Sequence, residues 1–421
     1  MKKTISLLLS ILLLIFLFSG CSEANTTSHT LQVGYGRVDI TPKDPVSLGG
    51  YDNPQNRISD SVTYNLYATC IALTDKNDNT VLLFHLDLLT ATQAVLFAKK
   101  EVSTATGIPF NQIIAATTHT HSAPALGSDF NNNVEYCKSL KQWMVTAAQE
   151  ALLDRKSAQV HTATAYPETL NYVRHYVMND GSIVGDNFGD ATGKTYVRHV
   201  HDVDNAMQLI KFTREGGKDV LLVNWQGHPH RDGGTTKRNV SSDIVGVLRE
   251  ELESQLDCHF AYFTGASGNV NNHSRIPAER ITNTCEEHGK ALAEYALRIE
   301  EYTQQDLGCV QFMTKSYSVP TSNNTGTMDI PMTVVSIGDI CFAVVPYEMF
   351  DSNGMELKKA SPFNMTFVVT CANGAFGYVP DVKAFEYGGY EVKLCSMAKG
   401  SGELLANEYV NMLKELYNTK E

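Results

Sequence analysis

Short apolar runs alternate with longer amphipathic stretches along most of the chain, and this alternation limits the fold to one class. The runs have the length of strands and lie at 66–73, 81–89, 112–116, 220–225, 259–264, 332–337, 341–346 and 365–372. The helical spacing of apolar residues marks 92–106, 134–154, 242–256, 283–301 and 402–417. Because no internal repeat or low-complexity linker interrupts the alternation, we expect a single α/β domain of mixed β-sheets covered by helices.

The composition is that of a globular protein, 43% hydrophobic and 19% charged, with a net charge of −12. A surplus of negative charge disfavours nucleic acid as a partner, and it also disfavours a basic face that would bind anionic lipid. A small molecule or a lipid therefore remains as the expected substrate.

The N-terminus has the pattern of an export signal. Lys2 and Lys3 precede an apolar run at 5–18, which ends in Phe18-Ser19-Gly20-Cys21. The run is shorter than the about 20 residues of a membrane-spanning helix and suits a signal-peptide core. Small residues before a cysteine are typical of a lipoprotein processing site, with Phe18 where leucine is more usual.

This pattern divides the chain into three parts. We expect a lipoprotein signal peptide at 1–20, a polar tether at 21–30 with a lipidated Cys21, and a large domain at 31–421. The protein would then be exported and would contact the cell envelope through its N-terminal lipid; the alternative is an uncleaved membrane anchor.

The cysteines argue against a thiolate metal site. None of the eight that follow Cys21 stands in a CxxC pair. Cys70, Cys341 and Cys371 lie inside apolar runs, where a buried free thiol is expected. Export permits disulfides, but the spacing identifies none.

Two of the apolar runs open onto pairs of histidines, His119 with His121 and His228 with His230. Histidines separated by one residue face the same side only on an extended or looped backbone, such as a strand end. Neutral imidazole binds zinc well, and a catalytic site needs three or four nitrogen or oxygen ligands. The two pairs therefore predict two halves of one metal site; ordinary surface or core histidines are the alternative.

Glu348 and Tyr378 are weaker candidates when each is taken alone. Glu348 follows the apolar run at 341–346 directly, where a glutamate also suits the start of a helix. Tyr378 lies in the glycine-containing segment 373–380, where a core or turn tyrosine is equally expected.

Several segments, colinear along the chain, resemble the neutral ceramidase family. They are 33–42 with 49–51, 66–68 leading to 84–87, 118–124, 224–228, 346–348 and 378–391. The segment 118–124 resembles that family's THTHSGP motif, with Ala123 in place of glycine. Each motif is short, but the ordered set runs from about residue 33 to the end of the chain.

The resemblance implies roles for individual residues. The zinc ligands that it implies are His119, His228, Glu348 and Tyr378. The residues that it places against the substrate and its developing oxyanion are His121, Tyr390 and Arg174. His230 is an alternative to His228, because members of the family differ by one residue in this loop.

The chain departs from the family in two places. Asn271 stands where the family has a serine that is important for activity. The chain is also shorter, so we expect no C-terminal β-sandwich domain. Chemistry by metal-bound water does not require the serine, because the metal itself generates the nucleophile near neutral pH.

The function expected from this resemblance is that of a zinc-dependent amidohydrolase of sphingolipid metabolism or a related pathway. Metal-bound water would cleave an amide (N-acyl, ceramide-like) or an ester bond. The alternatives are a non-catalytic surface lipoprotein that binds zinc or another ligand, and a family member that keeps the fold but has lost catalysis.

Overall fold

The computed structural model describes residues 31–51, 54–127, 131–306 and 308–419. The predicted signal peptide and tether lie outside these residues. Among the helices of the described part, none is both long and apolar enough to cross a membrane.

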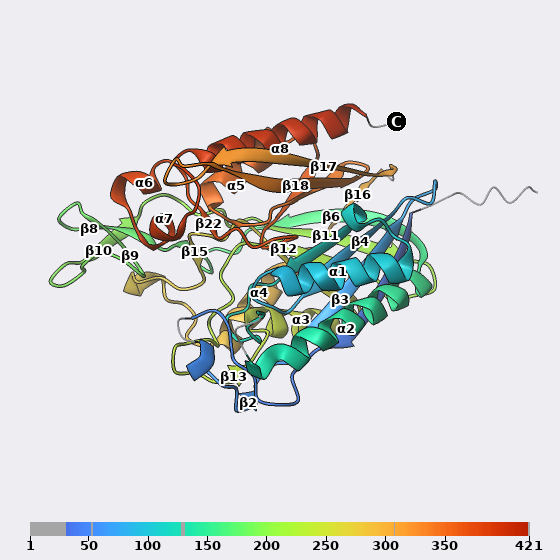
Figure 1. Ribbon diagram of the computed structural model, residues 1–421, viewed down its shortest axis with the longest axis horizontal. Helices are drawn as coiled ribbons and strands as arrows, with labels where there is room; N and C mark the ends of the chain where they lie inside the picture. The colour runs from blue at the N-terminus through green and yellow to red at the C-terminus, as the bar shows by residue number, and fades with distance from the viewer. Residues whose placement is uncertain (1–30, 52–53, 128–130, 307, 420–421) are drawn as a thin grey trace, which may run out of the picture.

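Two β-sheets form the centre of the molecule (Figure 1). The larger sheet contains β1 (Gln32–Asp39), β3 (Tyr67–Thr74), β4 (Thr80–Leu86), β5 (Ile113–Thr117), β6 (Lys156–Ala165), β11 (Met207–Arg214), β12 (Val220–Trp225), β14 (His259–Thr264) and β16 (Thr303–Gln305). The smaller sheet contains β17 (Val310–Pro320), β18 (Thr327–Ile337), β19 (Ile340–Val344) and β21 (Met365–Val369). Parallel and antiparallel neighbours occur in both sheets, so both are mixed, as predicted.

Helices cover the outer face of each sheet. The large sheet carries α1 (Gln93–Thr106), α2 (Val134–Leu153), α3 (Ile244–Leu256) and α4 (Cys285–Leu297), and the small sheet carries α5 (Asp351–Ala360) and α8 (Ser401–Asn418). Figure 1 shows α8 lying over β17 and β18, with α1 and α2 at the other side of the molecule. The described residues thus form one α/β/β/α domain, and the predicted fold class is confirmed.

The core between the sheets follows from the alternation of side chains along each strand. On β4, Leu83 faces the small sheet, whereas Leu82 and Phe84 face the helices α1 and α2. On β18, Val335 faces the large sheet and Val334 faces α8. Both faces of these strands are buried, which explains why they appear in the sequence as continuous apolar runs.

Some strands have no such run, and the sequence pattern does not predict them. Along β6 and β11, buried residues alternate with half-buried or exposed ones. Lys211, for example, lies on β11 between the buried Ile210 and Phe212. The pattern of apolar residues does not predict these strands, because polar side chains interrupt it at every second position.

Three parallel strand pairs direct their carboxyl ends to one place: β4 with β5, β12 with β14, and β19 with β21. Hydrogen bonds hold these ends together. The hydroxyl of Thr264 donates to the carbonyl of Thr118 at 2.8 Å, and the amide of Thr370 donates to the carbonyl of Thr264 at 2.9 Å. Ligand sites in α/β sheets form at such carboxyl ends, so the fold identifies where a site should lie.

Smaller elements surround this place. They are β7 (Tyr172–Val173), β15 (Val270–Asn271), β20 (Glu348–Met349), β22 (Tyr378–Val379), α6 (Ala384–Tyr387) and α7 (Tyr390–Leu394). A small sheet of β8 (His175–Met178), β9 (Ile183–Gly185) and β10 (Tyr196–His199) projects from the same end of the molecule (Figure 1). The strands β2 (Ser61–Val62) and β13 (Asn239–Val240) pair nearby.

The cysteines of the described chain are unpaired. Cys70, Cys341 and Cys371 are buried, as the sequence predicts.

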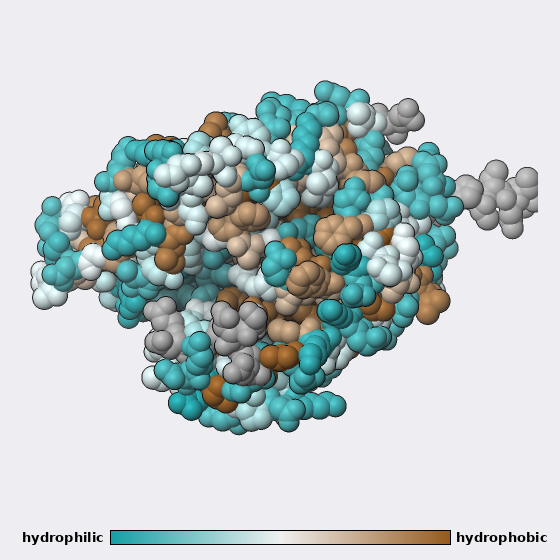
Figure 2. Space-filling view, viewed as in Figure 1, coloured by the Kyte–Doolittle hydropathy of each residue, from teal (hydrophilic) through white to brown (hydrophobic). Residues whose placement is uncertain are grey.

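Over the face shown in Figure 2, apolar residues are interspersed with hydrophilic ones, in keeping with the globular composition.

Lys99 on α1 gives a test of the core. Its ammonium lies 3.2 Å from Asn373 Oδ1 and 3.9 Å from the centre of the Phe110 ring, and burial lowers its pKa to about 7. The unfolded chain binds the proton more tightly, with a pKa of about 10.4. Burial of Lys99 therefore lowers the free energy of unfolding. This loss of stability grows as the pH falls from about 10 to 7 and reaches its full size below that range.

We therefore expect Lys99→Met to raise the free energy of unfolding by roughly 1–3 kcal/mol at pH 6, after allowance for the lost hydrogen bond. The gain should shrink to less than about 1 kcal/mol near pH 10, because the folded lysine is already neutral there and the unfolded lysine begins to lose its proton. Urea unfolding of both proteins at the two pH values measures this. An equal gain at both values would show that the lysine charge is not the cause.

Candidate metal centre

His119 follows β5 and is held in an unusual backbone conformation. Its φ is 67°, in the left-handed region that a residue with a side chain seldom adopts. The amide donates to Leu88 at 2.9 Å, and Nδ1 lies 2.8 Å from the carbonyl oxygen of Leu89. Since a carbonyl only accepts, Nδ1 carries a proton, so Nε2 is the nitrogen that can offer a lone pair to a metal. Burial opposes protonation of Nε2, but Cys371 and Glu348 outweigh it and raise the pKa of His119 well above its usual value. Such local strain is characteristic of functional sites.

His228 lies in the loop after β12 and is fully buried. Its Nδ1 is 3.1 Å from the carbonyl oxygen of Val270, so its Nε2 also presents a lone pair. Burial, together with the positive charge of Arg174, lowers the pKa of His228 to about 4. The ring is therefore neutral at physiological pH, which is the form that binds a metal.

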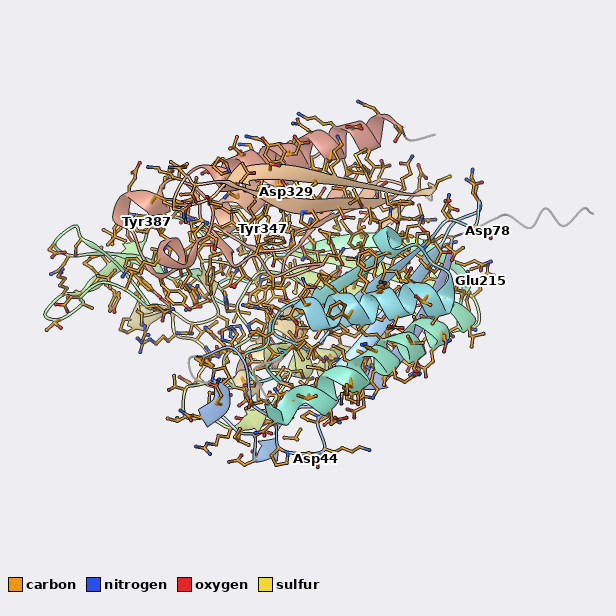
Figure 3. The ribbon with its side chains drawn as sticks, viewed as in Figure 1. Asp44, Asp78, Glu215, Asp329, Tyr347 and Tyr387 are labelled. Carbon is orange, nitrogen blue, oxygen red and sulfur yellow. The ribbon has the colours of Figure 1, made fainter. Side chains whose placement is uncertain are left out.

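Glu348 begins β20, directly after β19, and its carboxylate meets both imidazoles. Oε2 lies 3.2 Å from His119 Nε2 and 3.4 Å from His228 Nε2, and the side chain is 11% exposed. Burial opposes ionisation, but His119 and His228 outweigh it and hold the pKa of Glu348 well below its usual value. The preceding residue, Tyr347, lies inside the molecule (Figure 3).

These three groups fit a divalent metal ion. The two Nε2 atoms lie 3.2 Å apart and Glu348 Oε2 lies 3.2–3.4 Å from both, so two imidazole nitrogens and a carboxylate oxygen converge on one point. A proton on one ring would form a hydrogen bond between two of the three atoms, whereas a metal cation can bind all three at once. Ligands 2.0–2.1 Å from a tetrahedral zinc lie about 3.3 Å from one another, close to the separations found here.

Tyr378 lies beside this cluster. β20 and β22 are parallel, and their register pairs Glu348 with Tyr378. The Tyr378 side chain is buried, with the Tyr390 ring 5.7 Å away and the Arg174 guanidinium 5.6 Å from its ring centre. Tyr378 therefore borders the three converging groups on the side where Arg174 and Tyr390 lie.

His121 approaches the cluster with both ring nitrogens buried and without a hydrogen-bond partner. Its ring centre is 5.1 Å from that of His119 and 5.5 Å from that of His228. Burial, followed by repulsion from these two histidines, lowers the pKa of His121 well below its usual value. A neutral, unpartnered imidazole at this position is available to a bound molecule, and leaving it unpaired costs about 1–3 kcal/mol.

Gly50 and Tyr51 form the wall behind His121. At Gly50, φ is 98°, and a Cβ atom would lie 2.6 Å from the Cβ of His121, so only glycine fits. The Tyr51 ring meets the His121 ring edge-on at 5.2 Å. The sequence pattern indicates no role for these two residues, although their segment is part of the resemblance.

Arg174 is held by a buried carboxylate that the sequence analysis also left without a role. Glu391 Oε1 accepts from Arg174 Nε at 2.7 Å, and its Oε2 lies 3.1 Å from His175 Nε2. Tyr387, seen toward the β8–β10 end of the molecule in Figure 3, hydrogen-bonds the other nitrogen of His175 at 3.0 Å. The guanidinium is thereby fixed beside Tyr378 with its positive charge retained.

Asn271 and His230 form the border of the cluster. His230 Nε2 lies 3.1 Å from Asn271 Oδ1, and Arg174 donates to the same oxygen at 3.5 Å. Burial lowers the pKa of both His228 and His230, so charge does not distinguish them. Geometry does: His228 Nε2 faces His119 and Glu348, whereas His230 Nε2 faces Asn271.

The seven residues that the sequence analysis singled out thus lie in one neighbourhood at the carboxyl ends of the strands. His119, His121 and His228 have ring nitrogens within 4.8 Å of one another and can hold a metal ion. Together, the fold and this cluster define an α/β/β/α protein with a candidate metal centre at its strand ends.

Comparison with solved structures finds the same fold in neutral ceramidase from Pseudomonas aeruginosa, with a TM-score of 0.72 and 14% sequence identity. The match covers 92% of this chain and 75% of that chain. A ceramidase complexed with C2 matches with the same TM-score, identity and coverage. The sequence matches no protein-family profile and no curated protein. The chain therefore has a ceramidase-like fold.

Proposed function

We propose that the protein is a zinc-dependent hydrolase that cleaves an amide, of the N-acyl or ceramide-like kind, or an ester bond. The observation that carries the proposal is the convergence of His119 Nε2, His228 Nε2 and Glu348 Oε2 within 3.2–3.4 Å of one another. Two imidazoles and a carboxylate are a known ligand set of catalytic zinc, which keeps one position open for water or substrate. The ceramidase-like fold supports the same reading.

His119, His228 and Glu348 would hold the ion, and Tyr378 would complete the set. Bound zinc supplies a Lewis acid that polarises a carbonyl and activates water near neutral pH. Glu348 is the one carboxylate among these groups, so it supplies the negative charge that offsets part of the metal's charge.

The surrounding residues suit an acyl-transfer reaction. His121 has a free ring nitrogen, which in the appropriate tautomer donates a hydrogen bond to the oxyanion that develops from the carbonyl. Arg174, held by Glu391, adds a fixed positive charge nearby. Tyr390 lies beyond Tyr378 and would contact the substrate. Asn271 carries an amide, which does not act as an alkoxide nucleophile, so water is the attacking group.

Metal analysis and a substrate screen test the proposal. We expect about one zinc per chain in the purified protein, and turnover of N-acyl amides or esters that a chelator abolishes and added zinc restores. Zinc without turnover of any such substrate would instead favour a non-catalytic zinc-binding lipoprotein or a catalytically degenerate enzyme. Chelator-resistant turnover, or the absence of a stoichiometric transition metal, would contradict the proposal.

We also propose that the protein is exported and anchored through a lipid on Cys21. The motive is the sequence pattern at 1–21. Mass spectrometry of the membrane-extracted protein should find an N-terminal lipid-modified cysteine. An unmodified Cys21, or an intact Met1, would refute it.

A further inference from the structure

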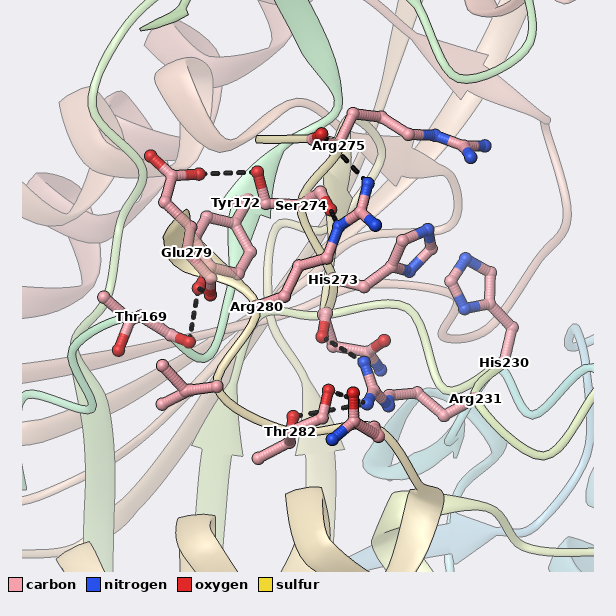
Figure 4. A pocket seen from close by; sticks show the side chains of 13 residues that line it. Thr169, Tyr172, His230, Arg231, His273, Ser274, Arg275, Glu279, Arg280 and Thr282 are labelled. Atoms are coloured by element: carbon pink, nitrogen blue, oxygen red, sulfur yellow. Dashed lines mark hydrogen bonds between the residues drawn. The ribbon is translucent and has the colours of Figure 1, made fainter. Parts of the chain in front are cut away.

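A cavity of about 360 Å³ opens beside the candidate metal centre (Figure 4). His230 and His273 stand on the right side of the lining in this view, with the guanidinium of Arg231 below them and those of Arg275 and Arg280 above. The loops that form it follow β12 and β14 and continue to the start of α4. It is therefore built by the same strand ends that carry His228 and Asn271.

The cavity is separated from the metal centre by one imidazole. The His230 ring centre is 5.6 Å from that of His121 and 5.6 Å from that of His228. On its other side it is 5.5 Å from the ring of His273, which lines the cavity. The metal centre and the cavity are thus one imidazole apart, so a molecule bound at both would need only a short substituent to reach from one to the other.

The positive charges of the cavity are not neutralised by carboxylates that line it. Arg231 donates to the carbonyl oxygens of Asn272 at 3.0 Å and Thr282 at 2.7 Å. Within the described ranges, Arg231 has no carboxylate oxygen within 4.0 Å of its side-chain nitrogens. Carbonyl oxygens fix the guanidinium in place but leave its full positive charge.

Arg280 is bound in the same way. Its Nε donates to the carbonyl of Ser274 at 2.9 Å, and a terminal nitrogen donates to the carbonyl of Arg275 at 3.0 Å. The described part of the chain offers it no ion-pair partner either. Arg275 itself pairs with Asp186 at 2.9 Å.

The one acidic residue that lines the cavity is already engaged. Glu279 accepts from Ser274 at 2.5 Å and lies 2.8 Å from His199 Nε2. With Arg275 paired to Asp186 and Glu279 engaged, Arg231 and Arg280 leave the lining positive, although the whole chain has a net charge of −12. A positive cavity in an acidic protein concentrates anions of matching size.

We propose that the substrate of the hydrolase carries an oxyanion, a carboxylate or a phosphate ester, that binds in this cavity while its acyl carbonyl lies at the metal centre. Guanidinium groups bind such oxygens with charge-assisted, often bidentate hydrogen bonds. The inference rests on the proposed hydrolase function. It narrows the expected substrates from N-acyl compounds in general to those with an anionic group close to the amide.

Three matched ligands test this inference: N-dodecanoylglycine, N-dodecanoylethanolamine and the phosphate ester of the latter. The first and third are anionic and the second is neutral, and all three share the acyl chain and the amide. Binding is measured by calorimetry on the chelator-treated full-length protein, and hydrolysis is measured on the zinc-loaded protein. We expect an anionic ligand to bind about 10–100-fold more tightly than the neutral one; which of the two does so distinguishes a carboxylate from a phosphate site.

Arg280→Gln is the decisive variant, because it removes a charge without leaving a carboxylate unpaired. It should remove most of the preference for the anionic ligand, whereas binding of the neutral ligand should change little. Arg280→Lys should restore part of the preference. Arg298, an exposed arginine at the C-terminal end of α4 that pairs with Glu294, provides the control, and Arg298→Gln should behave as wild type.

Two results would overturn the inference. One is equal binding of anionic and neutral ligands by the wild-type protein. The other is an Arg280→Gln variant that weakens binding of both ligands equally, which would indicate only a structural role. If no ligand is hydrolysed but the preference for the anion persists, the proposed hydrolase function fails while the anion site stands.

Discussion

Replacing His228 with alanine is expected to remove the bound zinc and, with it, all hydrolytic activity. The change deletes one of the three atoms that converge at the centre and leaves His119 Nε2 and Glu348 Oε2 with an incomplete set. Loss of a residue that only hydrogen-bonds to a metal ligand lowers metal affinity roughly 10–100-fold. Loss of a ligand itself lowers it further. Metal analysis after dialysis, together with hydrolysis assays, measures both effects.

His230→Ala is the matched control. It removes an imidazole of the same loop that burial also keeps neutral, but whose Nε2 faces Asn271. This variant should retain about one zinc per chain. Circular dichroism should show both variants folded. Retention of zinc by His228→Ala together with its loss from His230→Ala would assign the ligand to the other histidine and refute the centre described above.

Replacing His121 with alanine is expected to lower kcat by about 10²–10³ while the zinc remains bound. The reason is that His121 presents buried, unpartnered nitrogens toward the cluster but does not share the closest contacts among His119, His228 and Glu348. Its loss therefore removes a donor to the developing oxyanion and leaves the proposed ligands in place. Stopped-flow or steady-state kinetics give kcat, and metal analysis gives the zinc content.

His121→Gln provides a second measurement, because its amide can donate a hydrogen bond from a similar distance. Partial recovery of kcat with this variant would support the role of a hydrogen-bond donor. Loss of zinc from His121→Ala would instead make His121 a ligand, which its proximity to the other two histidines allows. An unchanged kcat with zinc retained would remove His121 from the reaction.

The strands that the apolar runs predict are those whose burial is uniform. β12 and β14 are buried on both faces, so their apolar runs match the observed limits, Val220–Trp225 and His259–Thr264. β6 and β11 expose part of one face, and polar residues such as Lys211 break their pattern. A continuous apolar run indicates a strand that is buried on both faces. A strand that is buried on only one face has no such run and is missed.

The surroundings of the centre were less predictable. Glu391 acts through a contact with a residue remote in sequence, Arg174. Glu391 meets Arg174 across more than two hundred positions of the chain, a separation of 217. No local pattern carries such a contact, since it depends on how β8, α7 and the loop after β14 pack.

The sequence by itself determined the class of the fold and the location of the candidate site. Apolar runs that end in histidine or glutamate place His119, His228 and Glu348 after β5, β12 and β19, because parallel strands share their carboxyl ends. It left open the choice between His228 and His230. Only the tertiary structure distinguishes the two, because one imidazole turns toward His119 while the other turns toward Asn271. The rings of His228 and His230 are only two residues apart in the chain, but they face different partners. The packing of the loop determines which partner each ring faces.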